Sequence, residues 1–121
     1  MTKKILLIED EEIIAGLLER KLIQGGYKVW VARDGGEGLR KMKEAKPDLI
    51  LMDILMPKMG GFAVLEEMQK EPDLKKIPVI MISNSGQPVE LEKAQQLGVK
   101  DWLIKAEFDP QEVIEKVKKY V

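Results

Sequence analysis

The sequence predicts an α/β protein in which a parallel sheet of five strands is covered on both faces by five helices. Three continuous apolar runs, at residues 5–8, 49–52 and 79–82, are too short for typical helices and lack polar alternation, as expected of strands buried on both faces. Segments with apolar residues at helical spacing lie between the strands. No linker or repeat interrupts this alternation, so residues 1–121 are expected to form one domain.

The first third of the chain contains two predicted strands around one helix. Residues 5–8 form the first strand, and an acidic run follows it directly. Apolar residues recur at helical spacing over residues 13–22, and the glycines at positions 25 and 26 predict the end of this helix. Residues 27–32 alternate polar and apolar side chains at their start and are rich in strand-forming types, which indicates a more exposed strand.

The middle of the chain continues this order. Asp34 is expected to cap a helix that ends by Pro47, because an aspartate side chain accepts hydrogen bonds from the first free backbone N–H groups of a helix. The central buried strand follows and ends in Asp53. Apolar residues over positions 62–68 then predict a helix that closes near Pro72.

The last third contains two strands and two helices. Residues 77–82 predict another buried strand, and a helix over residues 88–97 stops at Gly98. Residues 100–105 form a short final strand. Asp109 is an N-cap followed by a proline at the first helical position, which indicates the start of the last helix.

Composition excludes several classes of function. The chain has 20 basic and 21 acidic residues, so its net charge of −1 provides no general attraction to nucleic acid or to anionic membranes. It has no cysteine and no histidine, which excludes thiolate catalysis, histidine acid/base chemistry, zinc bound through these residues and a phosphohistidine on this chain. No apolar segment approaches the roughly 20 residues of a membrane span, and a cytoplasmic location is expected.

Polar side chains follow the predicted strands, and in a parallel sheet these strand ends share one edge. The residues at this edge are Glu9, Asp10, Glu11, Asp53, Ser83 and Lys105. Carboxylates that are brought together repel one another unless a cation lies between them, and a ligand set of oxygens alone suits Mg²⁺. A lysine and a hydroxyl close by would bind further oxygens of a phosphoryl group.

Asp53 is the best candidate for a nucleophile that forms an aspartyl phosphate. Each residue of this edge also has an ordinary structural explanation when taken singly. Asp53 could simply end a strand, residues 9–12 could be a solvated acidic helix start, Ser83 a loop hydroxyl and Lys105 a surface charge. Their joint occurrence at strand ends favours a phosphoryl-transfer site over these separate explanations.

Four segments together resemble the receiver domain of two-component response regulators, and the likeness runs from residue 4 to the last helix. Residues 5–11 are similar to that family's first strand and acidic pair, and residues 47–57 to its phosphoacceptor strand and loop. Residues 78–83 resemble its hydroxyl strand, and residues 101–105 its strand with an aromatic residue and a lysine. The resemblance implies a doubly wound, flavodoxin-like sheet in the order 2-1-3-4-5, which alternation alone leaves open.

The resemblance also implies a role for each residue of the acidic part of the site. Asp53 would accept the phosphoryl group, and Glu9 and Asp10 would serve a site for Mg²⁺, the implied cofactor. The direct metal ligands would be Asp10, Asp53 and the backbone carbonyl of Leu55. Because the chain has no histidine, the phosphoryl donor must be external: a sensor histidine kinase, a phosphotransfer protein or a small molecule.

A conformational switch is a further implication of the resemblance. Ser83 and Lys105 would bind phosphoryl oxygens, with Ser83 moving toward the group while Trp102 turns inward. These movements would alter the face made by the fourth helix, the fifth strand and the fifth helix, where a downstream protein target would read the signal. A static, half-buried Trp102 is the alternative.

The chain departs from the family pattern at three positions, Ala106, Gly60 and Trp102. Ala106 follows Lys105 where the family commonly has a proline after a cis peptide bond, and a non-proline cis bond costs about 2.5 to 4 kcal/mol, so either the loop stores that strain or the bond is trans. Gly60 replaces a common Asp or Asn, which is expected to affect loop geometry only, and Trp102 is bulkier than the usual Tyr or Phe. Leu55 has no polar group to orient an attacking water, which predicts slow loss of the phosphate.

The leading hypothesis is a phosphorylation-dependent signalling switch that is not an enzyme, binds neither nucleic acid nor membrane, and forms homodimers when phosphorylated. An aspartyl-phosphate phosphohydrolase is a second hypothesis, but Leu55 stands where such enzymes usually carry a second Asp. A receiver-like interaction module that takes no phosphate is the third. Since the chain ends one helix after Lys105, we expect either a stand-alone receiver or a part of a longer regulator.

Overall fold

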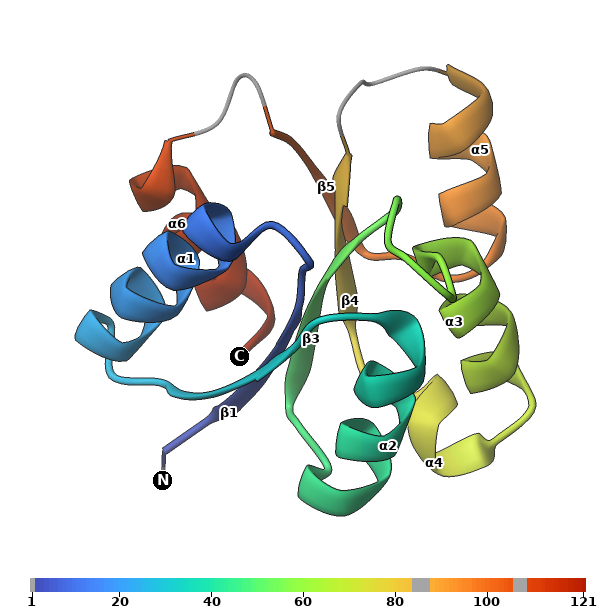
Figure 1. The fold of residues 1–121 in the computed structure, drawn as a ribbon, viewed down its shortest axis with the longest axis horizontal. Coiled ribbons are helices and arrows are strands. Elements are labelled where there is room, and N and C mark those ends of the chain that lie inside the picture. The colour runs from blue at the N-terminus through green and yellow to red at the C-terminus, as the bar shows by residue number, and fades with distance from the viewer. Residues whose placement is uncertain (1, 84–87, 106–108) are drawn as a thin grey trace.

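The computed structural model describes residues 2–83, 88–105 and 109–121, which contain five strands separated by helices, six in all (Figure 1). The strands are β1 (Lys4–Ile8), β2 (Lys28–Ala32), β3 (Leu49–Asp53), β4 (Val79–Ser83) and β5 (Asp101–Ile104). The helices are α1 (Glu12–Gln24), α2 (Gly35–Ala45), α3 (Gly61–Gln69), α4 (Pro72–Lys75), α5 (Pro88–Gln96) and α6 (Pro110–Tyr120). The predicted α/β class is confirmed.

The described part of the chain has one helix more than the five that the sequence predicts, and the additional helix is α4. Pro72 cannot continue α3, but it suits the first position of a new helical turn, and the buried Leu74 anchors this turn on the core. With four residues, α4 is too short for its apolar spacing to be recognised in the sequence. The fourth and fifth helices of the sequence prediction are therefore α5 and α6.

The five strands pair in parallel in the order β2-β1-β3-β4-β5, which confirms the order implied by the resemblance. β3 lies in the centre, and each of its five residues is buried. The register places Asp53 beside Ile82 and Ser83 beside Ile104. The final residues of β3, β4 and β5 consequently lie at one edge of the sheet.

The continuous apolar strands are explained by helices on both faces of the sheet. Alternate residues of β1 point to opposite faces, so that Ile5 and Leu7 pack against α1 and α6, whereas Leu6 and Ile8 belong to the core beside α2, α3 and α4. Figure 1 shows α1 and α6 on one side of the sheet and the other helices on the opposite side. Within the described residues, no helix combines the length and apolar character needed to span a membrane.

Both predicted aspartate caps are confirmed. The Asp34 side chain accepts a hydrogen bond of 2.9 Å from the Glu37 N–H at the start of α2. Asp109 does the same for the Glu112 N–H at the start of α6, at 3.0 Å. Gly98 adopts a φ of +87° in the turn after α5, a left-handed conformation that favours glycine.

An ion pair between β5 and α6 makes part of the stability depend on pH. The Asp101 carboxylate lies 2.8 Å from Lys116 Nζ and also accepts a hydrogen bond from the Tyr120 hydroxyl at 3.2 Å. Burial alone would raise the pKa of Asp101, but the hydrogen bonds from Lys116 and from the Trp102 N–H outweigh it and hold that pKa below its ordinary value of 3.8. The charged form of Asp101 is therefore favoured in the folded state.

This shift predicts the pH dependence of the substitution Asp101→Asn. The pKa of Asp101 is lower in the folded state than in the unfolded state. The stabilisation that its carboxylate provides is therefore fully present above the unfolded-state pKa and is lost as the pH falls through the folded-state pKa. Asp101→Asn is expected to lower the free energy of unfolding by about 1 kcal/mol at pH 7, and by progressively less below about pH 4. Urea titrations of the parent protein and of Asp101→Asn, at pH values from 7 to below about 4, test the expectation. A difference in the free energy of unfolding that stays constant with pH would contradict it.

Candidate phosphoryl-transfer site

The parallel sheet brings four of the sequence-predicted residues to its carboxyl edge. Glu9 directly follows β1, Asp53 and Ser83 are the last residues of β3 and β4, and Lys105 directly follows β5. The backbone hydrogen bonds between strands extend to this edge, since the Lys105 N–H donates to the Ser83 carbonyl at 2.7 Å. Glu9, Asp53 and Ser83 are each at most 2% exposed. These groups are thus held by rigid elements and shielded from water.

Lys105 connects the acidic residues of this edge. Its Nζ lies 2.8 Å from Asp53 Oδ2, 2.8 Å from Glu11 Oε2 and 3.2 Å from Glu9 Oε2. Its side chain is only 9% exposed. The alternative explanation of Lys105 as a surface charge is therefore wrong.

The ammonium group of Lys105 stays charged in this position. Burial by itself would lower the pKa of Lys105, but its hydrogen bonds to Asp53, Glu11 and Glu9 more than offset that effect and raise the pKa above the ordinary range. Burial has the opposite effect on Glu9, whose pKa it raises to about 7, with the Asp53 charge contributing in the same direction. The hydrogen bond from the Glu11 N–H and the contact with Lys105 lower the Glu9 pKa, but they offset only part of this rise.

Three carboxylates converge beside this lysine. Glu9, Asp10 and Asp53 each present an oxygen, and these oxygens all lie within 4.8 Å of one another. Asp53 Oδ1 is buried and has no hydrogen-bond partner among the described residues. An acceptor buried without a donor is costly, and a divalent cation bound by oxygen ligands would remove that cost. The acidic cluster therefore fits Mg²⁺ in charge and donor type.

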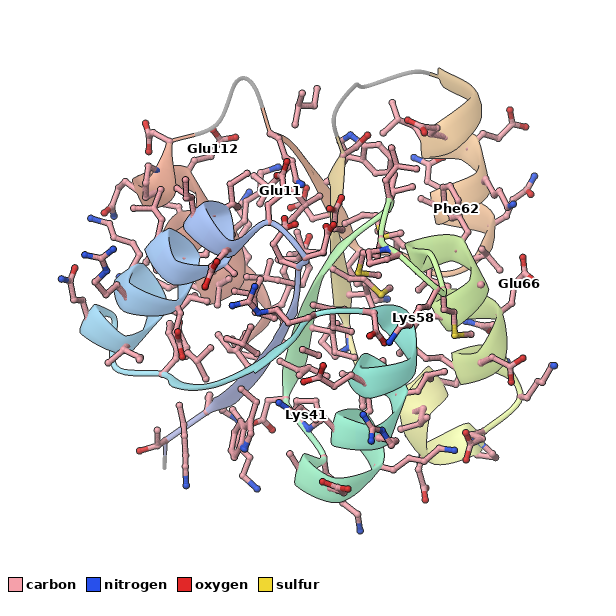
Figure 2. All side chains as sticks on the ribbon, viewed as in Figure 1. Glu11, Lys41, Lys58, Phe62, Glu66 and Glu112 are labelled. Atoms are coloured by element: carbon pink, nitrogen blue, oxygen red, sulfur yellow. The ribbon has the colours of Figure 1, made fainter. Side chains whose placement is uncertain are left out.

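Glu11 is a member of this site to which sequence reasoning assigned no role. It is half-exposed and lies at the start of α1, where Figure 2 labels its side chain near the strand ends. Its 2.8 Å contact joins it to Lys105, 94 residues later in the chain. The only signal in the sequence was its place in the acidic run after the first strand.

Ser83 contacts the beginning of α5. Its hydroxyl donates to Glu90 Oε1 at 3.3 Å, and Glu90 lies in the first turn of α5. Sequence reasoning did not single out Glu90, because an acid in the first turn of a helix is common for reasons of the helix dipole alone. The contact joins the hydroxyl at the end of β4 to a helix of the face expected to carry the signal.

Trp102 lies in β5, paired in register with Met81, and is half-buried against the core shared by α2, α3 and α4. Its indole Nε1 is buried without a hydrogen-bond partner among the described residues. This arrangement agrees with the alternative of a half-buried anchor, and an inward turn of the ring stays a prediction. Ala106, and with it the expectation about a cis bond, lies outside the described residues.

The loop after β3 contains two residues, Leu55 and Gly60, for which the sequence makes predictions. Leu55 is 63% exposed, so it contributes an apolar side chain at the rim. Gly60 precedes α3 with no side chain to cap it, and its expected effect on loop geometry stays a prediction. The predicted role of the Leu55 carbonyl as a metal ligand stays a prediction.

Comparison with known proteins places this site in a family. The family model described as the response regulator receiver domain matches residues 5–118. The chain is 36% identical over 118 residues to the alkaline phosphatase synthesis transcriptional regulatory protein PhoP of Bacillus subtilis, covering 98% of this chain and 48% of that protein. It is 38% identical over 111 residues to a probable transcriptional regulator, ycf27, of Cyanophora paradoxa, covering 92% and 45% of the two chains. The chain thus spans about half the length of these relatives.

Solved structures agree with this assignment. The chemotaxis protein CheY4 of Vibrio cholerae has a TM-score of 0.93 and 27% identity, with both chains covered completely. The receiver domain of the sensor histidine kinase PA1611 of Pseudomonas aeruginosa, solved with a magnesium ion coordinated in its active site cleft, has a TM-score of 0.89 and 26% identity, covering 99% and 98% of the two chains. This chain belongs to the response regulator receiver domain family.

Proposed function

We propose that residues 1–121 form one receiver domain that works as a phosphorylation-dependent switch, with Asp53 as the phosphoacceptor. The observation that carries this proposal is the geometry of Asp53, whose carboxylate is buried at a strand end, with one oxygen 2.8 Å from Lys105 Nζ and the other unpartnered among the described residues. A nucleophilic carboxylate needs this combination of fixed position and adjacent positive charge.

The transfer replaces one bond to phosphorus by another. A carboxylate oxygen of Asp53 attacks phosphorus, the new O–P bond forms, and the bond from phosphorus to the donor breaks, with the electron pair remaining on the donor. Asp10, Asp53, the Leu55 carbonyl and, less directly, Glu9 would hold Mg²⁺, which would neutralise charge on the phosphoryl oxygens when bound. Lys105 and Ser83 would bind two of those oxygens, Lys105 as a permanent cation.

Partners and readout form the second part of the proposal. The donor is a sensor histidine kinase or a phosphotransfer protein, and the response is read by a downstream protein at the face of α5, β5 and α6. Ser83 and Trp102 are the proposed switch residues, and the contact from Ser83 to Glu90 supports a link between the site and α5. Homodimerisation on phosphorylation and a cytoplasmic location complete the proposal, in which this domain is not an enzyme and binds neither nucleic acid nor membrane.

Intact mass spectrometry tests the phosphoacceptor. After incubation with Mg²⁺ and acetyl phosphate, the chain is expected to gain one phosphate, and neither Asp53→Ala nor a sample with chelator is expected to gain any. An adduct that survives Asp53→Ala would contradict the assignment of Asp53. If no adduct forms, the phosphate mimic beryllofluoride provides a second test, read from Trp102 fluorescence in a Trp30→Phe background. Unchanged fluorescence together with no adduct would favour the interaction module that takes no phosphate.

The apolar side chain of Leu55 predicts a long-lived phosphate. Leu55 lies two residues after Asp53 and cannot hydrogen-bond a water for attack on phosphorus. The substitution Leu55→Asn is expected to shorten the half-life of the adduct by about tenfold, because an amide can orient that water. Ile23→Asn, which changes another exposed apolar residue at the far end of α1, should leave the half-life unchanged. Hydrolysis within seconds in the parent chain would contradict the prediction.

A further inference from the structure

The hydrogen-bond donors of Lys105 are all occupied in this structure. A lysine ammonium group carries three N–H donors. They meet Asp53 Oδ2 at 2.8 Å, Glu11 Oε2 at 2.8 Å and Glu9 Oε2 at 3.2 Å. An oxygen of a phosphoryl group can therefore bind Lys105 only if one of these carboxylates gives up its hydrogen bond.

Asp53 and Glu9 are poorly suited to release this lysine. Asp53 would carry the phosphoryl group, so Lys105 has to stay beside it in both states. Glu9 is 0% exposed, and its Oε2 also accepts a hydrogen bond from the Glu11 N–H at 3.1 Å. Because a buried carboxylate that loses its positive partner is destabilising, both contacts are expected to persist.

Glu11 differs from these two carboxylates in its exposure. Its side chain is 53% exposed, against 0% for Glu9 and 3% for Asp53. It occupies the N-cap position of α1, at the start of the helix in Figure 2, but its side chain makes no capping hydrogen bond there. The Glu11 carboxylate can therefore turn to water without leaving a buried charge or losing a helix cap.

A phosphoryl oxygen is a strong competitor for the position that Glu11 holds. An exposed ion pair is weak, because water and salt compete for both of its charges. An anionic phosphoryl oxygen would make a charge-assisted hydrogen bond to the same Lys105 N–H, in a more buried position beside Asp53. Until it leaves, the Glu11 carboxylate also repels the incoming group, since both are negative.

We propose that Glu11 is a positioning residue for the phosphoryl transfer, which holds Lys105 in the unphosphorylated protein and yields it to an oxygen of the incoming phosphoryl group. The inference rests on the proposed function, because it takes Asp53 as the phosphoacceptor. Glu11 acts through Lys105 alone: one Nζ–H exchanges Glu11 Oε2 for the phosphoryl oxygen, and the Glu11 side chain moves into water. This competition makes the parent chain accept the phosphoryl group more slowly than the rest of the site allows.

The rate of adduct formation tests this competition. With saturating Mg²⁺ and acetyl phosphate as the donor, Glu11→Ala is expected to gain its phosphate about threefold faster than the parent chain. Glu12→Ala is the matched control, since Glu12 carries the same charge at the next position but lies 3.9 Å from Arg33. This control should react at the parent rate. Intact mass spectrometry over time measures all three chains, and damage to the site would slow the reaction rather than accelerate it.

The side-chain NMR signal of the Lys105 ammonium group provides a second readout, which needs neither Mg²⁺ nor a phosphoryl donor. Its absence in Lys105→Met assigns the signal. It is expected to shift in Glu11→Ala and to stay in place in Glu12→Ala, because of these two residues it is Glu11 that accepts a hydrogen bond from Lys105.

The outcomes separate this inference from the proposed function. An adduct on the parent chain that forms no faster in Glu11→Ala than in Glu12→Ala, or an unmoved Lys105 signal, would overturn the inference alone. A slower reaction of Glu11→Ala would also overturn it, in favour of a carboxylate that helps to hold Mg²⁺.

Beryllofluoride replaces acetyl phosphate if the parent chain forms no adduct. Glu11→Ala is then expected to bind it about threefold more tightly than the parent chain and Glu12→Ala do. Equal binding by the three chains would overturn the inference. If the parent chain neither forms an adduct nor binds beryllofluoride, the proposed function fails and the inference fails with it.

Discussion

Lys105→Met is expected to lower the free energy of unfolding by about 3 kcal/mol when Mg²⁺ is absent, because breaking a buried ion pair leaves charge uncompensated. Lys105 Nζ is the common partner of Asp53, Glu11 and Glu9, at 2.8, 2.8 and 3.2 Å. Without it, the buried carboxylates face one another with no cation between them. Urea denaturation in the presence of chelator measures the loss.

Mg²⁺ should recover part of the stability that Lys105→Met removes, since a divalent cation among the same carboxylates replaces the missing positive charge. Lys116→Met is the matched control, because Lys116 pairs with the single carboxylate of Asp101 at 2.8 Å on another face. This control should lose only about 1 kcal/mol, with no dependence on Mg²⁺. Equal losses in the two variants would contradict the central role of Lys105.

Gly61→Ala is expected to lower the free energy of unfolding by about 2 to 3 kcal/mol, as overpacking of a rigid core does. A Cβ at position 61 would lie 2.5 Å from the Asp53 carbonyl oxygen and 2.8 Å from Met81 Cε. The flexible Met81 side chain can move, but the Asp53 carbonyl belongs to the central strand and cannot move without displacing the proposed phosphoacceptor, Asp53. Slower formation of the phosphate adduct should therefore accompany the loss of stability.

Gly16→Ala is the matched control for this substitution. Gly16 lies within α1, and among the described residues no atom beyond its chain neighbours and the adjacent backbone of α1 would lie within 4 Å of an added Cβ. Because alanine favours helix more than glycine does, this variant should gain about 0.5 to 1 kcal/mol. If thermal or urea unfolding shows the two variants equally stable, the close approach between Gly61 and Asp53 is not a constraint on the fold.

The succession of strands and helices along the chain follows from local patterns in the sequence, whereas the order of the strands within the sheet does not. Continuous apolar runs such as residues 49–52 require cover on both faces, so they identify buried parallel strands without knowledge of their neighbours. The caps at Asp34 and Asp109 were equally predictable, since a cap bonds a backbone group three residues away. The single-turn helix α4 was not predictable, because four residues show no periodicity.

The candidate site was predictable at the level of which residues meet, but not how they pair. A parallel sheet brings the ends of its strands to one edge, which was enough to place Asp53, Ser83 and Lys105 together. Lys105 pairs with Glu11, and Ser83 pairs with Glu90. These pairings depend on the length and the direction of each side chain. Spacing along the chain does not contain that information.

The sequence by itself thus determined the α/β class, the buried strands, and the set of acidic, hydroxyl and lysine residues at one edge, because these depend on side-chain periodicity and on strand direction. The resemblance, and not the periodicity, supplied the order of the strands. Only the tertiary structure decided that Glu9 is buried beside Lys105 and that a Cβ at position 61 would lie 2.5 Å from the Asp53 carbonyl oxygen. These features arise from contacts between residues distant in sequence, which form only when the sheet and its helices pack.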